Sequence, residues 1–121
     1  MRIFKLKWFD KWSTKEKLKD DTLKNAISEI SQGLIDADLG SHVYKKRIAI
    51  QGQGKSGGYR TIVTFKSGEN TFFLYGFSKN ERDNINAKEL KAIKLMSKEL
   101  LSYNEQQLTQ AIKAGSLIEV K

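Results

Sequence analysis

The residues best suited to chemistry in this chain are the cations between positions 43 and 66. This stretch, VYKKRIAIQGQGKSGGYRTIVTFK, holds six basic residues and no acidic one. The nearest acids are Asp38 before it and Glu69 after it. Such a concentration of positive charge favours a polyanionic partner, and RNA is the partner that we expect.

Strand periodicity sorts these cations by direction. Alternate side chains of a strand share a face, so Lys45 and Arg47 point together while Lys46 points the other way. If the two flanking strands pair as a hairpin, Arg60 can join Lys45 and Arg47. Arg60 lies on the opposite face of its strand from four side chains that we expect to face the core: Tyr59, Thr61, Val63 and Phe65. Three cations on one face repel each other, a cost that a bound phosphate would offset. The alternative is a solvated basic face without a ligand.

The glycine-rich segment GQGKSG at residues 52–57 matches GxGxxG and the end of a P-loop. Both kinds of nucleotide site need a helix to start at once, so that its N-terminal amides face the phosphate. Here the chain continues with the strand-like YRTIV, and Ala49 stands where the first P-loop glycine belongs. We interpret the segment as a hairpin loop whose glycines permit positive φ. Lys55 could still contact phosphate from it.

A few residues besides the cations of residues 43–66 are also candidates for catalysis or RNA binding. His42 is the only histidine, which argues against a histidine metal centre or a two-histidine nuclease. Lys79 and Arg82 follow the third predicted strand, although Glu81 and Asp83 could pair with them. Four aromatic side chains could stack on bases or could belong to the core: Tyr44, Tyr59, Tyr75 and Phe77.

Length and composition limit the number of domains and the classes of protein to which the chain can belong. A chain of 121 residues suits one domain with a sizeable core, and its 22 Lys and Arg against 14 Asp and Glu give a formal charge of +8. The absence of cysteine removes disulfides and thiolate metal sites. No apolar run approaches the ~18 residues of a membrane span, and MRIFKLKWF has no signal-peptide core. We therefore expect a soluble, cytoplasmic protein.

The N-terminal third predicts one strand and one helix. Partial alternation over residues 3–9 indicates a strand, and STKE at residues 13–16 is a capping-box pattern. The stripe of the following helix is Leu23, Ile27, Ile30 and Leu34, with Gly33 placed to end it. Residues 33–41 are predicted to be a turn-rich connection.

The middle and end of the chain predict a meander followed by two helices. Strands are expected at Val43–Ile50, residues 59–66 and Thr71–Ser78. Asp83, Asn84 or Asn86 can cap the next helix, and Asn86 with Glu89 is the best capping-box candidate. The predicted stripe of this helix is Leu90, Ile93, Met96 and Leu100. A shorter helix, capped within residues 104–107, runs to about Ala114, ends at Gly115, and precedes a strand at residues 116–120.

These elements predict a single α+β domain over residues 1–121. Its small antiparallel sheet consists of the central three-stranded meander plus N- and C-terminal strands, with helices packed on it.

With these segments in view, the chain resembles the RelE-type toxins of bacterial toxin–antitoxin systems. It is similar over nearly its whole length to a subgroup marked by MRIFKxKWF, GLIDADLG, KxRIA, GQGKSGGYR, FFLYGFxKNERDNI, a KELLS-like helix and LIEV. The resemblance implies a microbial RNase fold, cleavage of mRNA in the ribosomal A site, and neutralisation by a cognate antitoxin.

The resemblance also implies site residues. YKKR at residues 44–47 resembles the family's Tyr-Lys-x-Lys strand, and GGYR at residues 57–60 its Ser-Gly-Tyr-Arg strand. SKNER at residues 78–82 resembles its Gly-Lys-Arg-x-Arg segment, but Asn80 stands where a catalytic arginine is expected. Asn86 likewise replaces an expected tyrosine. The catalytic positions so implied are Lys45, Arg47, Arg60 and Arg82.

The leading hypothesis is an endoribonuclease that uses neither metal nor cofactor, in which the ribose 2′-OH attacks the adjacent phosphorus. Arg60 would stabilise the phosphorane and Arg47 would bind phosphate. Neighbouring cations favour the neutral form of a lysine, so Lys45 is the candidate base. Arg82 would stabilise the leaving group. Further RNA contacts are assigned to Lys46, Lys55, Tyr59 and Lys79.

Two other functions remain open. The missing arginine at Asn80 favours a non-catalytic toxin of the ParE type that binds nucleic acid or DNA gyrase. A DNA-binding regulator is weaker, because no helix-turn-helix is evident. The expected partners are the ribosome, mRNA and a helix-turn-helix antitoxin encoded nearby, with no membrane. Lysines around the first helix could contact ribosomal RNA or only maintain solubility: Lys15, Lys17, Lys19 and Lys24.

Overall fold

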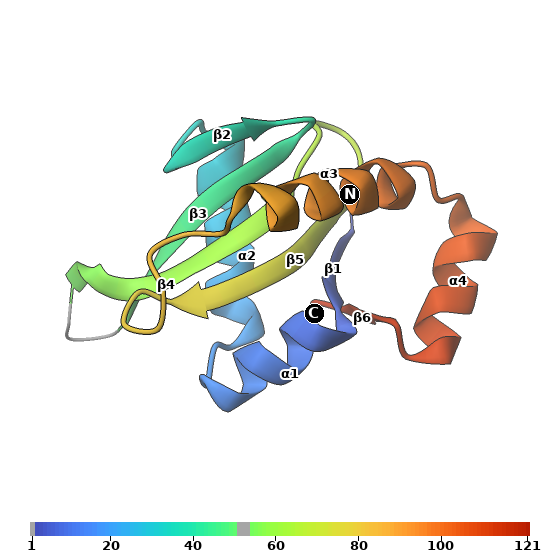
Figure 1. The fold of residues 1–121 in the computed structure, drawn as a ribbon. Helices are drawn as coiled ribbons and strands as arrows, with labels where there is room; N and C mark the ends of the chain where they lie inside the picture. Colours follow the sequence, from blue (N-terminus) through green and yellow to red (C-terminus); the bar gives the residue numbers. More distant parts are fainter. Residues whose placement is uncertain (1, 51–53) are drawn as a thin grey trace.

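The structure is a computed structural model that describes residues 2–50 and 54–121, with side chains described except at 50 and 54–57 (Figure 1). Lys55 as an RNA contact therefore lies outside the described side chains. The elements follow in the order β1 Ile3–Leu6, α1 Lys7–Lys15, α2 Asp20–Ser31, β2 Ala37–Gly40, β3 Val43–Ile50, β4 Gly54–Thr64, β5 Thr71–Ser78, α3 Ala87–Leu101, α4 Glu105–Ala114 and β6 Leu117–Glu119.

The strands form one open six-stranded sheet in the order β2-β3-β4-β5-β1-β6. The predicted α+β class and the antiparallel β3–β4–β5 meander are confirmed. The predicted bounds of the middle strand, residues 59–66, were wrong: β4 runs from Gly54 to Thr64 and so begins inside the segment predicted to be a hairpin loop, where Gly54 pairs with Ile50. The sheet is not purely antiparallel, however, because β1 pairs with β5 in parallel, Ile3 opposite Thr71. Strand β6 then pairs antiparallel with β1 on its outer side. Alternation within a strand carries no information on the direction of its neighbour, so the sequence could not reveal the parallel pair.

Helices cover both faces of the sheet (Figure 1). Helices α1 and α2 pack on one face, in an apolar layer that contains Phe9, Leu23, Ile27, Ile48, Val63 and Phe73. Helices α3 and α4 pack on the other, in a layer that contains Phe4, Phe72, Leu74, Leu100, Leu108 and Leu117. Both faces of β4 and β5 are thus buried, which gives the meander a rigid frame.

The N-terminal prediction was wrong in two respects. The first strand ends at Leu6, and the chain then turns into α1, where Phe9 is buried against Phe73 with ring centroids 5.0 Å apart. Residues 13–16 do not open a helix: Ser13 lies inside α1 and its hydroxyl donates to the carbonyl of Asp10. Aromatic burial at helical spacing therefore overrides the capping-box pattern.

The predicted stripe of α2 is largely confirmed. Leu23, Ile27 and Ile30 are buried, whereas Leu34 lies beyond the helix and is exposed. Gly33 has a positive φ of 86°, the left-handed conformation expected after a helix end. The connection that follows contains a strand that the sequence did not indicate, β2, whose four residues are too few to show a period.

Strands β2 and β3 are joined by a tight turn in which Ser41 and His42 both have positive φ, 56° and 63°. Positive φ at both central positions is the hairpin geometry whose twist matches the strands. The Asp38 carboxylate accepts from the N–H of Gly40 at 2.9 Å and steadies the approach to this turn.

The C-terminal helices begin as predicted. Asn86 caps α3 through a capping box with Glu89, and Asn104 caps α4 in the same way with Gln107. Gly115 ends α4 with a φ of 81°. The predicted stripe of α3 needs correction, because Met96 is exposed. In its place Ser97 is buried, and its hydroxyl contacts that of Thr64 on β4.

Candidate active site

The β3–β4 register places three cations on one face of the sheet. Arg47 stands directly opposite Arg60, and Lys45 stands opposite Ile62, two positions along the same ladder. Directly opposed residues point to the same side, so these three side chains share a face, as the alternation predicts. We call Lys45, Arg47 and Arg60 the cation cluster. It lies on the side covered by α3, because Thr64, on the same face of β4, contacts Ser97 of α3.

Arg60 is the most unusual member of the cluster. Its residue is only 7% exposed, yet Nη1 is buried without a hydrogen-bond partner. No carboxylate within residues 2–50 and 54–121 forms an ion pair with it. A buried charge without a counter-ion is costly, and such groups are normally paired. The guanidinium is therefore prepared for an anion that the described part of the chain does not supply.

The other two cluster members are more accessible. Arg47 is half-buried, and its Nε lies 3.6 Å from Oδ2 of Asp36 without forming a hydrogen bond. Lys45 is also half-buried, and no ion pair joins it to a carboxylate of the described residues. The cluster therefore presents a positive surface with a single, loosely placed carboxylate.

Arg82 lies close to the cluster but is tightly held. Its guanidinium sits 5.6 Å from the ring of Phe77, the residue opposite Arg60 on β5. It donates to both oxygens of Glu89 at 2.9 and 2.6 Å, to the Tyr75 hydroxyl at 3.3 Å, and to the carbonyl of Asn84 at 3.0 Å. Four of the five N–H groups of an arginine are thereby engaged.

This ion pair changes the protonation of both partners. Hydrogen bonds from Arg82, and then from the backbone N–H of Asn86, lower the pKa of Glu89 to about 2. The hydrogen bonds to Glu89 raise the pKa of Arg82. Because Glu89 also closes the capping box of α3, the pair fixes the start of that helix against the end of β5.

The loop after β5 holds the remaining predicted residues. Lys79 is exposed, and its backbone N–H bonds the carbonyl of Gly58 at 3.4 Å, which ties the loop to β4 near Arg60. Asn80 is exposed, and its N–H bonds the hydroxyl of Ser78. No other arginine of the described residues takes the place expected at Asn80, so Arg82 is the arginine of this segment.

Two residues assigned to RNA contact lie on the opposite face. Lys46 is 6% exposed, and its Nζ donates to the carbonyl of Leu34 at 2.8 Å and pairs with Glu29 at 2.7 Å. Tyr59 meets the edge of Trp12, with ring centroids 5.5 Å apart. Burial and a hydrogen bond with Glu16 raise the pKa of Tyr59. Both side chains help to hold α1 and α2, and neither faces the cation cluster.

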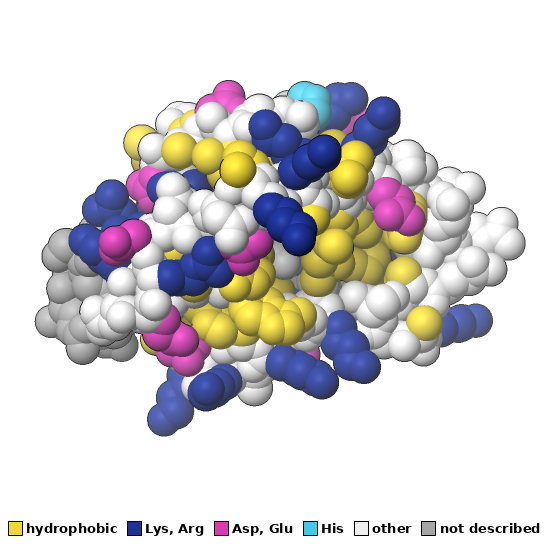
Figure 2. Space-filling view, in the orientation of Figure 1, with side chains coloured by type: hydrophobic (Ala, Val, Ile, Leu, Met, Phe, Trp, Pro, Cys, Tyr) yellow, Lys and Arg dark blue, Asp and Glu magenta, His cyan; other side chains and the backbone are white. Residues whose placement is uncertain are grey.

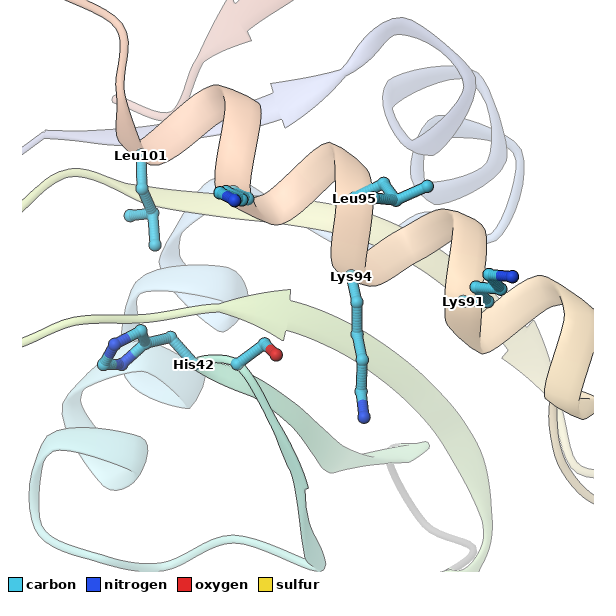
Figure 3. Close-up of a pocket in the computed structure, with 7 residues that line it drawn as sticks. His42, Lys91, Lys94, Leu95 and Leu101 are labelled. Atoms are coloured by element: carbon cyan, nitrogen blue, oxygen red, sulfur yellow. The ribbon is translucent and has the colours of Figure 1, made fainter.

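A cavity of about 350 Å³ lies between α3 and the β2–β3 turn (Figure 3). Lys94 and Leu101 reach from α3 toward the turn that carries His42. Its walls are Ser41, His42, Lys91, Lys94, Leu95, Lys98 and Leu101. Sequence patterns could not reveal this cavity, because its walls come from segments about fifty residues apart in the chain.

The described residues were also compared with the requirements of a metal site and of a membrane-spanning helix. Among them, no three His, Cys, Asp or Glu residues gather closely enough to hold a metal ion. None of the helices is long and apolar enough to cross a membrane, as judged over the residues that the structure describes.

An open six-stranded α+β sheet with helices on both faces is consistent with the RelE-like toxin fold. The family model described as "RelE toxin of RelE / RelB toxin-antitoxin system" matches residues 1–120. The chain therefore belongs to the RelE toxin family, whose members pair with a cognate antitoxin. The search among curated proteins gave no match.

Proposed function

We propose that this toxin is an endoribonuclease that cleaves mRNA on the ribosome and thereby represses translation. Membership of the RelE family supports this proposal in general terms. The observation that carries it is Arg60, a buried guanidinium with an unpartnered Nη1, set directly opposite a second arginine. Two opposed cations that have only one loosely placed carboxylate between them, that of Asp36, suit the doubly charged phosphorane of RNA cleavage.

In the proposed reaction the ribose 2′-oxygen forms a bond to the adjacent phosphorus while the bond to the 5′-oxygen breaks. The 2′-OH gives its proton to a base, and the departing 5′-oxygen takes up a proton. The products are a 2′,3′-cyclic phosphate and a free 5′-hydroxyl. Because the nucleophile belongs to the substrate, the protein needs chiefly to align the strand and stabilise negative charge.

The cation cluster divides these tasks by position. Arg60 donates to the phosphorane oxygens, because its rigid, buried position costs no rearrangement as charge develops. Arg47, more exposed, binds the phosphate through its planar fork of donors. Lys45, two residues along the same strand face, is the proposed base.

Arg82 and Lys79 belong to the proposal with narrower roles. Since four N–H groups of Arg82 are already engaged, only its remaining donor can reach the leaving oxygen. Its larger contribution is to position the end of β5 beside Arg60. Lys79, exposed on the loop tied to Gly58, adds a flexible cation for the RNA backbone. Lys46 and Tyr59 are left out of this RNA surface, because they face α1 and α2.

The test is a primer-extension map of cellular mRNA after induction of the toxin. New 5′ ends within codons are expected for the wild type. Arg60→Ala should reduce them by about 100–1000-fold, the usual loss for one charge-stabilising donor. Lys66→Ala, which removes an exposed lysine just beyond β4, is the matched control and should cleave normally. Cleavage by Arg60→Ala at the wild-type rate would overturn the proposal.

A second candidate is a non-catalytic toxin that binds nucleic acid or DNA gyrase, as ParE-type toxins do. The engagement of Arg82 by Glu89, together with Asn80 in place of an arginine, favours it. Such a toxin would block DNA supercoiling or bind RNA and yet leave no new mRNA ends. The same primer-extension map, read beside a gyrase assay, separates the two functions.

The proposed antitoxin is a helix-turn-helix protein that covers the cation cluster with acidic side chains. In the purified complex, Arg47 should lose its solvent exposure. A complex in which the cluster stays open to solvent would contradict this assignment.

A further inference from the structure

Trp8 is a large apolar side chain that the fold leaves half open. It lies in the first turn of α1 and is 49% exposed. Its ring stacks on that of Tyr75, with centroids 4.7 Å apart and planes 19° from parallel. Trp12, one helical turn further on, lies nearly parallel to it at 6.4 Å. The three rings form an ordered aromatic surface, which we call the Trp8 platform.

The Trp8 platform meets the candidate active site at the edge of β5. Trp8 and Trp12 come from α1, which packs on the other face of the sheet, whereas Tyr75 lies on the face of the cation cluster. Strand β1 pairs with β5 only at Thr71, Phe72 and Phe73, so Tyr75 lies beyond the end of that pairing. Tyr75 stands opposite Ile62, one pair along the same face from Phe77 and Arg60. Figure 2 shows hydrophobic surface between β5 and α1, bordered by basic side chains and by a few acidic ones. An RNA strand with a phosphate at Arg60 can therefore reach the platform with a neighbouring nucleotide.

The charges around the platform fit a nucleic acid. Three residues of α1 lie three, four and seven positions after Trp8 and therefore share its side of the helix: Lys11, Trp12 and Lys15. Both lysines are exposed, and neither forms an ion pair within the described part of the chain. Asp10, the acid of this helix, is engaged with Lys5 at 2.8 Å. Arg82 adds a guanidinium 6.0 Å from the Tyr75 ring.

Planar rings beside unpaired cations are what proteins use to bind single-stranded RNA, with bases on the rings and phosphates on the cations. An acidic peptide would use the lysines but would gain less from an exposed indole that is stacked on Tyr75. A purely structural tryptophan would cover Tyr75 with its ring buried, and half of the surface of Trp8 is open.

We propose that Trp8, backed by Tyr75, is a stacking site for an RNA base next to the nucleotide whose phosphate lies at Arg60. This inference rests on the proposed RNA substrate and adds a base-binding subsite to it. Lys11 and Lys15 would contact the following phosphates.

The test uses tryptophan fluorescence, because the chain contains only Trp8 and Trp12. In a Trp12→Phe variant, whose folding is checked by its thermal melt, the emission comes from Trp8 alone. The probe is a short single-stranded RNA with 2′-O-methyl groups, which cannot be cleaved by 2′-OH attack. Stacking should quench Trp8 saturably. By anisotropy of the labelled probe, Trp8→Leu should weaken binding about tenfold or more, and Trp8→Phe should restore most of it.

The outcomes separate this inference from the proposed function. Quenching by the probe together with intact mRNA in cells would support the stacking site and refute the nuclease. Unchanged Trp8 fluorescence when the probe binds, or equal affinity of Trp8→Leu and wild type, would overturn the stacking site even if cleavage depends on Arg60. Quenching only by a protein partner, and not by the RNA probe, would also overturn it in favour of a protein-docking surface.

Discussion

Arg47 and Arg60 stand directly opposite each other across the β3–β4 ladder, on the face of the sheet that α3 covers. Like charges placed this way destabilise a sheet, and here the nearest carboxylate oxygen to Arg47 is 3.6 Å away. Arg60 has no such neighbour among the described residues. The fold therefore maintains an unfavourable repulsion between Arg47 and Arg60, and a bound phosphate would offset it.

Arg47→Ala should weaken RNA binding in a salt-dependent manner. If Arg47 binds one phosphate, its loss removes about one released counterion. The slope of log affinity against log salt for single-stranded RNA should then fall in magnitude by about 0.7. Titrations of an uncleavable RNA at several salt concentrations measure this slope. An unchanged slope would show that Arg47 binds no phosphate.

Lys46→Met should affect folding and leave RNA affinity alone. The buried Nζ bonds both Glu29 and the carbonyl of Leu34, so its loss should lower the free energy of unfolding by about 1–3 kcal/mol. Urea denaturation measures the loss. Lys66→Met, at an exposed position, is the stability control. A clear fall in RNA affinity at unchanged stability would return Lys46 to the binding surface.

Glu89 should make the stability of the protein depend on acid pH. Its pKa is lowered to about 2 from an ordinary value of 4.5, so the folded state binds the proton less readily than the unfolded state. The stabilisation is therefore complete above about pH 4.5 and is lost as the pH falls toward 2. Against Glu89→Gln, the wild type should be more stable by a constant margin at neutral pH, and the margin should shrink below pH 4.5. A margin independent of pH would contradict the assignment.

Gly76→Ala should destabilise the domain through Trp12. A Cβ at position 76 would lie 2.3 Å from an atom of the Trp12 ring, far inside van der Waals contact. Displacing that ring should cost about 1–3 kcal/mol, measured by thermal unfolding. The double variant Gly76→Ala with Trp12→Leu should recover part of the loss. No recovery would mean that the strain lies elsewhere.

The sequence predicted the meander, the capped helices and the shared face of the cation cluster, because each depends on local spacing. Val43–Ile50 and Thr71–Ser78 were placed correctly by β-branched and aromatic content. Asn86 and Asn104 marked helix starts through the partner three residues on. These signals lie within one element, or within two neighbouring strands.

What the sequence missed depends on contacts between distant segments. The parallel pairing of β1 with β5 joins residues nearly seventy apart, and β2 is too short to show alternation. From the sequence alone, Glu81 or Asp83 was as good an ion-pair partner for Arg82 as any. The fold of the loop after β5 instead brings Arg82 to Glu89 and Tyr75. Trp8 was assigned to a strand, although its spacing of four from Trp12 was a helical signal.

The central claim is that Arg60 lies buried without a counter-ion among the described residues because RNA supplies one. Arg60→Met tests it most directly, since the apolar side chain fills the same space without the charge. We predict that its free energy of unfolding equals that of the wild type or exceeds it by up to about 4 kcal/mol, while cleavage of ribosome-bound mRNA falls about 100–1000-fold. A variant that unfolds more easily than the wild type and cleaves mRNA as fast would contradict the account.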